Sequence, residues 1–345
     1  MNDQFDVTIG IPVFKSVKSI SETLCSALNQ TFGDIEFLIV DDFGHDGSID
    51  VILQMCRTHP RGGNIRILSN DQNRGVSYCR NLIIDEARGR YLFFMDSDDL
   101  IEPNTIQLLY DALVHNQAQV AYGSYEIVDN VNNGPSQVYQ KAKMVLNGED
   151  ELAMYAFKYN HIFHVSVCNV LIDLSFLRNT GLKFLDVEYW EDMAFTIELV
   201  TLVNKAVLLS DVTYHYIRRS GSLSHYQTRF FLEKKELQKN ISVIDYLKEK
   251  CSFLKGKTYL PYLLYNLEMN SFYIVCHIFS KFHRIVPSFT NNEIRHVMWY
   301  PLHIGDIVNN RHRFVPNVLF YFLSKMPMCF FFPSIWMMGK YKKAI

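Results

Sequence analysis

Four short apolar runs in the first 95 residues, separated by three stretches with helical periodicity, constrain the fold of this chain more than any other feature. The runs cover residues 7–13, 35–40, 65–68 and 91–95. They are dominated by aliphatic and aromatic residues, as expected of strands that are covered on both faces of a parallel sheet. The alternation predicts an α/β fold with a mainly parallel, doubly wound sheet and flanking helices.

Acidic residues follow two of these runs directly. Asp41 and Asp42 come at the end of the second run, and Asp96, Asp98 and Asp99 follow the fourth. In open α/β sheets, ligands bind at the carboxyl ends of the strands. Carboxylates crowded there suit a hard divalent cation that also takes phosphate oxygens, so the pattern favours a diphosphate site. The structural alternatives are a helix cap after the fourth run and a solvated loop after the second.

Other nucleotide-binding and nucleic-acid-binding classes are disfavoured. No GxGxxG follows the first run, so the phosphate cradle of a dinucleotide fold is missing. The sequence Gly256-Lys257-Thr258 lacks the first glycine of a Walker A loop, because position 251 is cysteine. A net charge of −2 provides no basic excess for binding nucleic acid.

The chain has seven cysteines without a CxxC pair, and its sequence shows no secretory signal. These features predict a cytoplasmic protein with reduced thiols.

Several segments, in order along the first hundred residues, resemble the signature of family 2 of the nucleotide-sugar glycosyltransferases, an inverting family with the GT-A fold. They are VTIGIPVF at 7–14, QT with DIE at 30–36, VDD at 40–42, NRG with Ser77 and RN at 73–81, GRY at 89–91 and MDSDD at 95–99. Two places depart from the pattern: Lys15 stands where the family usually has asparagine, and Phe43-Gly44-His45 replaces the common Gly-Ser-Thr. Both departures fall at the rim of the nucleotide pocket.

The resemblance implies a role for each matching residue. The donor would be a nucleotide sugar, expected to be a UDP-hexose or UDP-N-acetylhexosamine, and the ion Mn²⁺ or Mg²⁺. Nucleotide contacts would come from Pro12, Phe14, Asp41, Asp42, Asn73, Gly75, Asp96, Ser97 and Arg219. Asp98, together with Asp96, would bind the metal that bridges the diphosphate. The assignment of Arg219 includes the nearby Ser222 as a second phosphate contact.

Glu191 and Asp192 open a strongly amphipathic stretch that predicts a helix. Acid at a helix N-terminus is favoured by the helix dipole without any function, and this is the structural alternative. The resemblance implies that Asp192 is the general base and that Glu191 hydrogen-bonds the acceptor or the sugar. A base is required because a sugar hydroxyl is a poor nucleophile until a carboxylate takes its proton.

The chain is expected to hold two domains. Residues 1–225 would form the catalytic domain, with a nucleotide-sugar half at 1–100 and an acceptor half at 101–225, and residues 226–345 a helical region. Residues 314–345 are rich in aromatic residues, but Lys325, Pro327 and Pro333 interrupt them and lysines follow, so a spanning helix is not expected. An interfacial membrane anchor and a buried helical hairpin both remain open.

The leading hypothesis is a metal-dependent inverting transferase that acts on a hydroxyl of a polysaccharide or lipid-linked glycan precursor. With residues 314–345 as an interfacial anchor, the protein would lie on the inner face of the cytoplasmic membrane. The first alternative is a catalytically silent nucleotide-sugar-binding or scaffold protein with the same fold, which the intact Asp98 and Asp192 disfavour. The second is a nucleotidyltransferase, which lacks its expected glycine-rich or basic triphosphate loop near the first strand. The sequence does not specify the sugar, the acceptor or the linkage.

Overall fold

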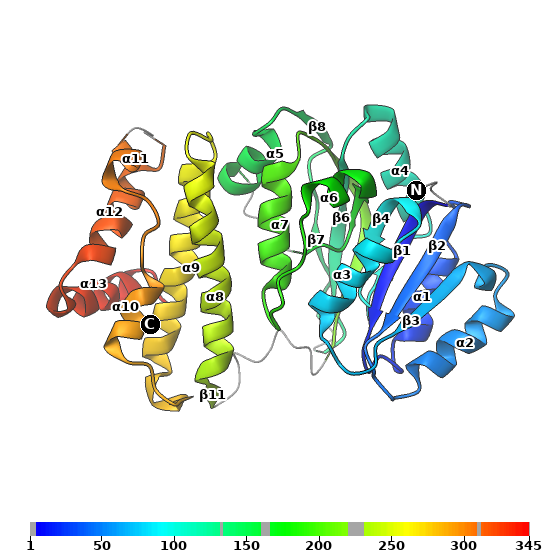
Figure 1. Ribbon diagram of the computed structural model, residues 1–345, viewed down its shortest axis with the longest axis horizontal. Helices are drawn as coiled ribbons and strands as arrows, with labels where there is room; N and C mark the ends of the chain where they lie inside the picture. Colours follow the sequence, from blue (N-terminus) through cyan, green and yellow to red (C-terminus); the bar gives the residue numbers. More distant parts are fainter. Residues whose placement is uncertain (1–4, 132–133, 160–165, 220–230, 309–311, 345) are drawn as a thin grey trace. The chain divides into compact units, whose positions relative to one another are not determined.

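The computed structural model describes residues 5–131, 134–159, 166–219, 231–308 and 312–344 (Figure 1). These residues form two compact units, Met1–Leu152 with Ile162–Ser222, and Ala153–His161 with Leu223–Ile345. The expected domain boundary at residue 225 lies outside the described residues. The short segment 153–161 belongs to the second unit, which the sequence pattern did not indicate.

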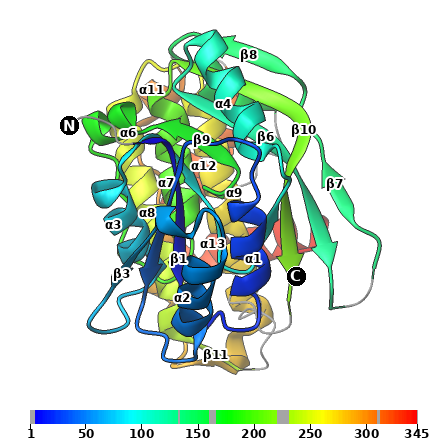
Figure 2. The same ribbon diagram turned by 90° about the vertical axis from the view of Figure 1, so that its right-hand side faces the viewer.

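The first unit is organised around one sheet with the strand order β3-β2-β1-β4-β9-β6-β10-β5, to which β7 and β8 are added on β6 and β10 (Figures 1 and 2). The strands are β1 (Phe5–Val13), β2 (Ile35–Asp41), β3 (Ile65–Ser69), β4 (Gly89–Phe94), β5 (Leu100–Ile101), β6 (Val120–Asp129), β7 (Gln137–Tyr139), β8 (Met144–Asn147), β9 (Val170–Asp173) and β10 (Lys205–Arg218). The strands β1 to β4 are mutually parallel, which confirms the predicted α/β fold. Beyond them, β9 runs antiparallel between β4 and β6.

Helices cover both faces of this sheet. Side chains of α1 (Ile20–Leu28), α2 (Ser48–Thr58) and α4 (Thr105–Asn116) share a core with the strands. On the other side α3 (Val76–Glu86) and α6 (Leu174–Thr180) lie against the strands, and α5 (Glu151–Met154) and α7 (Glu191–Leu202) follow in the chain (Figure 2). Gly10 permits the approach of α3, because a Cβ there would lie 2.4 Å from Ile83 Cγ2. Residues 7–13 are consequently all buried.

The second unit is mainly helical. Its elements include a π-helical turn (Tyr155–Tyr159), β11 (Leu232–Glu233), α8 (Lys234–Lys250), α9 (Leu260–Ser280), β12 (Ile285–Val286), α10 (Asn291–Val297), α11 (Ile304–Val308), α12 (Phe314–Lys325) and α13 (Met328–Tyr341). The helix α8 begins at Lys234, because Leu232 and Glu233 pair with β12 and Glu233 forms a capping box with Glu236. In its interior, Lys248 Nζ forms an ion pair with Glu268 Oε1 at 2.9 Å, with both side chains fully buried.

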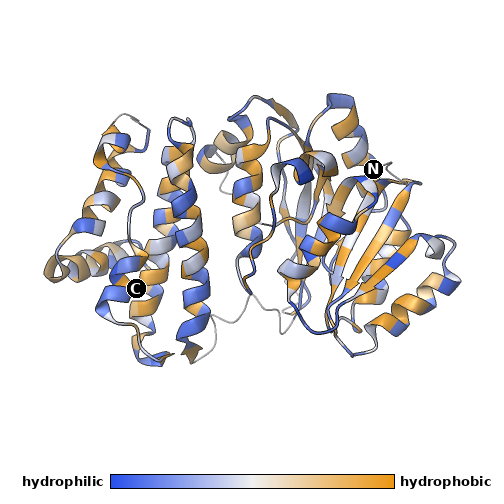
Figure 3. Cartoon of the chain, viewed as in Figure 1, coloured by the Kyte–Doolittle hydropathy of each residue, from blue (hydrophilic) through white to orange (hydrophobic). Residues whose placement is uncertain are grey.

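The last two helices each bury one side and expose the other. Inward residues such as Phe320 and Phe331 are 4% and 0% exposed, whereas Leu319 and Met337 are 60% and 66% exposed. Hydrophobic residues dominate α13 in Figure 3. Within the described part of the chain, every helix is too short or too polar to cross a bilayer.

Candidate active site

The guanidinium of Arg80 gathers three of the predicted site carboxylates. Its Nη2 lies 2.9 Å from Asp96 Oδ1, and its Nη1 lies 3.0 Å from Glu191 Oε1 and 2.5 Å from Asp192 Oδ1. The Arg80 side chain is only 4% exposed. One buried cation therefore joins the acid after β4 to the pair that opens α7, about a hundred residues later in the sequence.

Short polar contacts explain how α7 reaches this position. On α3, Asn81 exchanges two hydrogen bonds with the backbone of Phe184, at 2.9 and 2.8 Å, and Ser77 donates to the Val187 carbonyl at 3.2 Å. The segment leading to α7 is thus fixed along α3. Trp190 then adopts a left-handed conformation, φ 65°, and the first turn of α7 presents its acids to Arg80.

Burial dominates the electrostatics of the cluster. It raises the pKa of Asp192 to about 7, against the opposing effect of Arg80, and Glu191 and Asp96 add to the rise. Burial also raises the pKa of Glu191, again opposed by Arg80. For Arg80 itself, burial alone would lower the pKa, but the carboxylates of Asp192 and Asp96 raise it well above its ordinary value. A carboxyl group with a pKa near neutrality is suited to general-base catalysis.

The remaining acids after β4 have different roles. Asp99 is 1% exposed, and its oxygens accept hydrogen bonds from Tyr214 Oη at 2.7 Å and from the Ile217 amide at 2.9 Å. It therefore fastens β10 to the end of β4.

Asp98 is less enclosed than Asp99. Burial and then the neighbouring Asp96 raise the pKa of Asp98 to about 6, while Arg219 lowers it. Arg219 donates to the Asp98 carbonyl at 2.8 and 3.2 Å, which places it in the site, while Ser222 lies outside the described residues.

Among the predicted nucleotide contacts, Asp42 organises a loop. It is 3% exposed; Oδ1 accepts hydrogen bonds from the Asn70 side chain and the Arg74 amide, and Oδ2 from the Gly75 amide, each at 2.8 Å. Gly75 has φ +85°, a conformation that favours glycine, and it caps α3. The structure thus gives Asp42 a positioning role for residues 73–75. Asp41 is more exposed, and its predicted contact with a base stays a prediction.

The other predicted nucleotide contacts lie around the same sheet edge. Pro12 is buried inside β1, whereas Phe14 is 44% exposed and is the residue of this segment that can face a base. Ser97 Oγ lies 2.6 Å from Ser16 Oγ and joins the segment after β1 to the end of β4. Asn73 is exposed and lines a polar hollow.

The residues fit a metal only if the substrate supplies part of its coordination. Among the described residues, no group of three or more His, Cys, Asp or Glu side chains is arranged to hold an ion. Asp96 uses Oδ1 for Arg80, which leaves Oδ2 and the Asp98 carboxylate as oxygen donors. Two carboxylates, completed by phosphate oxygens and water, are a common ligand set for Mg²⁺.

Arg80 is the important residue that the sequence reading did not place in the site. The family signature includes Arg80 but implies no role for it. A signal was present, because Arg80 occupies the apolar side of a helix whose other buried positions include Cys79 and Ile83. A charged residue there is rarely buried unless it is paired.

Comparison with known proteins gives consistent results. A family model described as "Glycosyl transferase family 2" matches residues 8–181. The glycosyltransferase GlyG of Streptococcus pneumoniae is 27% identical over 230 residues, which cover 63% of this chain and 72% of GlyG. UDP-Glc:alpha-D-GlcNAc-diphosphoundecaprenol beta-1,3-glucosyltransferase WfgD of Escherichia coli is 30% identical over 128 residues, which cover 37% of this chain and about half (49%) of WfgD.

The fold also resembles a solved structure. The crystal structure of S. aureus TarS 1-349 in complex with UDP-GlcNAc superposes with a TM-score of 0.65 and 16% identity, covering 92% of this chain and 90% of that one. At this identity the likeness concerns the fold alone.

Proposed function

This chain belongs to glycosyl transferase family 2 and is a glycosyltransferase with the GT-A fold, and from this premise we propose that it transfers a sugar from a uridine nucleotide to a hydroxyl of a polysaccharide or lipid-linked glycan precursor, with inversion at the anomeric carbon. The observation that carries the proposal is the Arg80 cluster, which brings Asp96 beside Glu191 and Asp192. The name of WfgD gives UDP-Glc as its donor and a diphosphoundecaprenol-linked GlcNAc as its acceptor, and the TarS complex contains UDP-GlcNAc. Both support the donor class proposed here, and WfgD also supports the acceptor class.

In this proposal Asp192 is the base. Its carboxylate accepts the proton of the acceptor hydroxyl while that oxygen attacks the anomeric carbon, and the bond to the nucleoside diphosphate breaks on the opposite side. Glu191 lies beside it and holds the acceptor or the sugar by hydrogen bonding. Arg80 keeps both acids in place. One base is sufficient, and inversion follows from a single displacement.

Asp96 and Asp98 would hold the divalent cation. The cation, when bound, supplies positive charge that stabilises the diphosphate leaving group. Asp42 shapes the loop of Asn73 and Gly75 that would close over the nucleotide, and Phe14 would contact the base. Arg219, which donates to the Asp98 carbonyl, would contact a diphosphate oxygen.

A panel of nucleotide sugars tests this function and its metal dependence. We expect purified protein to consume a UDP-sugar in the presence of Mn²⁺ or Mg²⁺ and to lose this activity in EDTA. Asp98→Asn should abolish transfer in the presence of the metal, because it removes one of the two carboxylates proposed to hold the ion. Undiminished transfer in EDTA, or by the Asp98→Asn protein, would contradict the metal assignment. Preferential use of a guanosine nucleotide would contradict the proposed donor.

We also propose that α12 and α13 rest on a membrane surface. Val315, Leu319 and Phe322 form an exposed row at helical spacing on α12, and Phe330, Trp336 and Met337 form another on α13, all more than half exposed. Lys340, Lys342 and Lys343 follow and would attract anionic lipid.

Vesicle co-sedimentation tests this membrane contact. We expect the protein to bind vesicles containing phosphatidylglycerol, and a Phe330→Ala, Trp336→Ala double variant to bind roughly tenfold or more weakly because it loses apolar burial. Phe253→Ala is the matched control, since Phe253 is an aromatic residue of the same unit that is 84% exposed and lies outside both rows. Equal binding by all three proteins would refute the proposed surface.

A further inference from the structure

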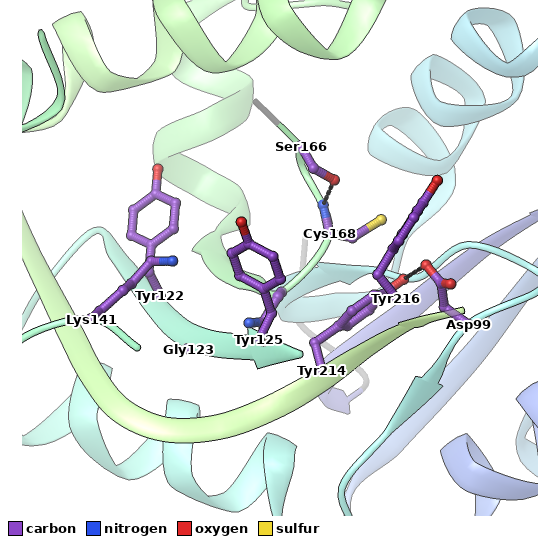
Figure 4. Close-up of a pocket in the computed structure, with 10 residues that line it drawn as sticks. Asp99, Tyr122, Gly123, Tyr125, Lys141, Ser166, Cys168, Tyr214 and Tyr216 are labelled. Carbon is purple, nitrogen blue, oxygen red and sulfur yellow. Dashed lines mark hydrogen bonds between the residues drawn. The ribbon is translucent and has the colours of Figure 1, made fainter. Parts of the chain in front are cut away.

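A second hollow is lined by residues of β6, of β10 and of the segment that precedes β9, in the half of the first unit that is predicted to bind the acceptor. It is lined mainly by aromatic side chains, Tyr122, Tyr125 and Tyr216, together with Lys141, Cys168 and Asp99 (Figure 4). In the strand order β6 and β10 follow β4 on the side away from β1 and β2, so the pocket lies apart from the nucleotide contacts that are predicted on β1 and β2. Figure 4 shows Tyr122 and Tyr125 among the side chains that line it.

The pocket adjoins the acid cluster. Tyr214 lines it. The Tyr214 hydroxyl accepts a hydrogen bond from the Asp96 amide at 3.3 Å and donates one to the Asp99 carboxyl group at 2.7 Å. Cys168 lines it as well and pairs with Phe94 at the end of β4. A group held in this pocket would therefore lie close to the acids that follow β4.

Lys141 is the unusual member of this lining. The residue is 8% exposed, and no charged group among the described residues acts on its ammonium. The ammonium lies 5.2 Å from the centroid of the Tyr125 ring. Burial is the one cause that acts on its pKa, lowering it to about 8.

The backbone fixes this lysine in place. The Lys141 amide donates to Ser124 Oγ at 2.8 Å, and the preceding Gln140 side chain donates to the Ser210 carbonyl at 3.1 Å. The segment is thus tied to β6 and to β10, and Lys141 is directed into the pocket rather than toward solvent.

The charge of Lys141 is poorly compensated by the protein. A buried ammonium costs several kcal/mol unless it is paired. A cation–π contact returns only about 0.5–2 kcal/mol. The nearest acid of the pocket, Asp99, already accepts hydrogen bonds on both oxygens. A buried ammonium that has no carboxylate partner suits an oxyanion.

We propose that this pocket binds an anionic group of the acceptor, a phosphate or a sugar carboxylate, and that Lys141 is the residue that recognises it. The inference rests on the proposed transferase function, since it concerns the acceptor of that same reaction. It narrows the acceptor class to anionic glycans or phosphate-linked precursors.

The test is anion binding to the full chain saturated with UDP and Mg²⁺, so that the nucleotide site is filled. Inorganic phosphate and glucuronate are the two probes, and NMR of ¹³C-labelled lysine side chains reports the titration of Lys141. We expect one or both anions to raise the pKa of Lys141 above about 8. Lys141→Met should weaken anion binding by roughly tenfold or more. Lys143→Met is the matched control, because Lys143 is exposed two residues away.

The outcomes separate the two proposals. Stronger binding of phosphate or of glucuronate identifies the acceptor group, and either result supports the inference. It is overturned if neither anion perturbs Lys141, or if Lys141→Met binds both anions as well as the wild type. Thermal melting shows whether Lys141→Met is folded, which we expect since it removes an unpaired buried charge. If the wild type neither binds nor consumes nucleotide sugars, the transferase proposal itself fails, independently of Lys141.

Discussion

Arg80→Met is expected to destabilise the protein by about 3–5 kcal/mol and to abolish sugar transfer. The variant leaves the carboxylates of Asp96, Glu191 and Asp192 close together in a buried site without their shared cation. Part of the destabilisation would be relieved by protonation of these carboxylates, so the effect should be largest above pH 7, where Asp192, whose pKa burial raises to about 7, is ionised. The measurements are the free energy of unfolding in urea and the transfer rate.

Two further variants make this result specific. In Arg80→Lys the positive charge is kept, but the ammonium group lacks the planar guanidinium geometry that contacts three carboxylates at once. We therefore expect intermediate stability and low activity. Arg90→Met is the matched control, because Arg90 is exposed on β4 and contacts none of the acids. Wild-type stability and activity in Arg80→Met would show that the cluster does not need its cation.

Asp192→Asn is expected to lower kcat by about 10²–10⁴-fold while the affinity for the donor nucleotide changes little. Asparagine keeps the size of the side chain but cannot accept the acceptor proton. The measurements are kcat with saturating donor and the dissociation constant of UDP. Asp50→Asn, an exposed position on α2, controls for a change of charge elsewhere. Loss of donor affinity together with transfer would count against Asp192 as the base and favour a structural role for it.

The parts of the fold that depend on local sequence were predictable. The strands β1 to β4 follow from apolar runs whose length and spacing are local properties, and the acids after β2 and β4 lie at one sheet edge because parallel strands end together. The apolar stretch at 314–345 is interrupted at Lys325 and Pro327, and α12 ends and α13 begins at this interruption.

Tertiary contacts were not predictable in the same way. The burial of Arg80 could be suspected from its place on the apolar side of a helix, but its partners could not, because these acids come from α7 and from the end of β4. Asp42 has the spacing of a ligand-binding acid, yet the fold uses both of its oxygens to shape residues 70–75. No sequence pattern indicates that Lys141 is buried, because its burial results from contacts of its segment with β6 and β10. Each of these roles requires knowing which segments meet.

The central claim, that Asp192 inside the Arg80 cluster is the catalytic base, is tested most directly by the pH dependence of kcat with saturating donor and metal. Below its pKa the carboxyl group is protonated and cannot take the proton of the acceptor. Because burial raises that pKa to about 7, the wild-type rate should increase as the pH rises through neutrality and then level off. The Asp192→Asn protein should lack this rise. A wild-type rate that is constant between about pH 5 and 9, or the same rise in Asp192→Asn, would contradict the claim.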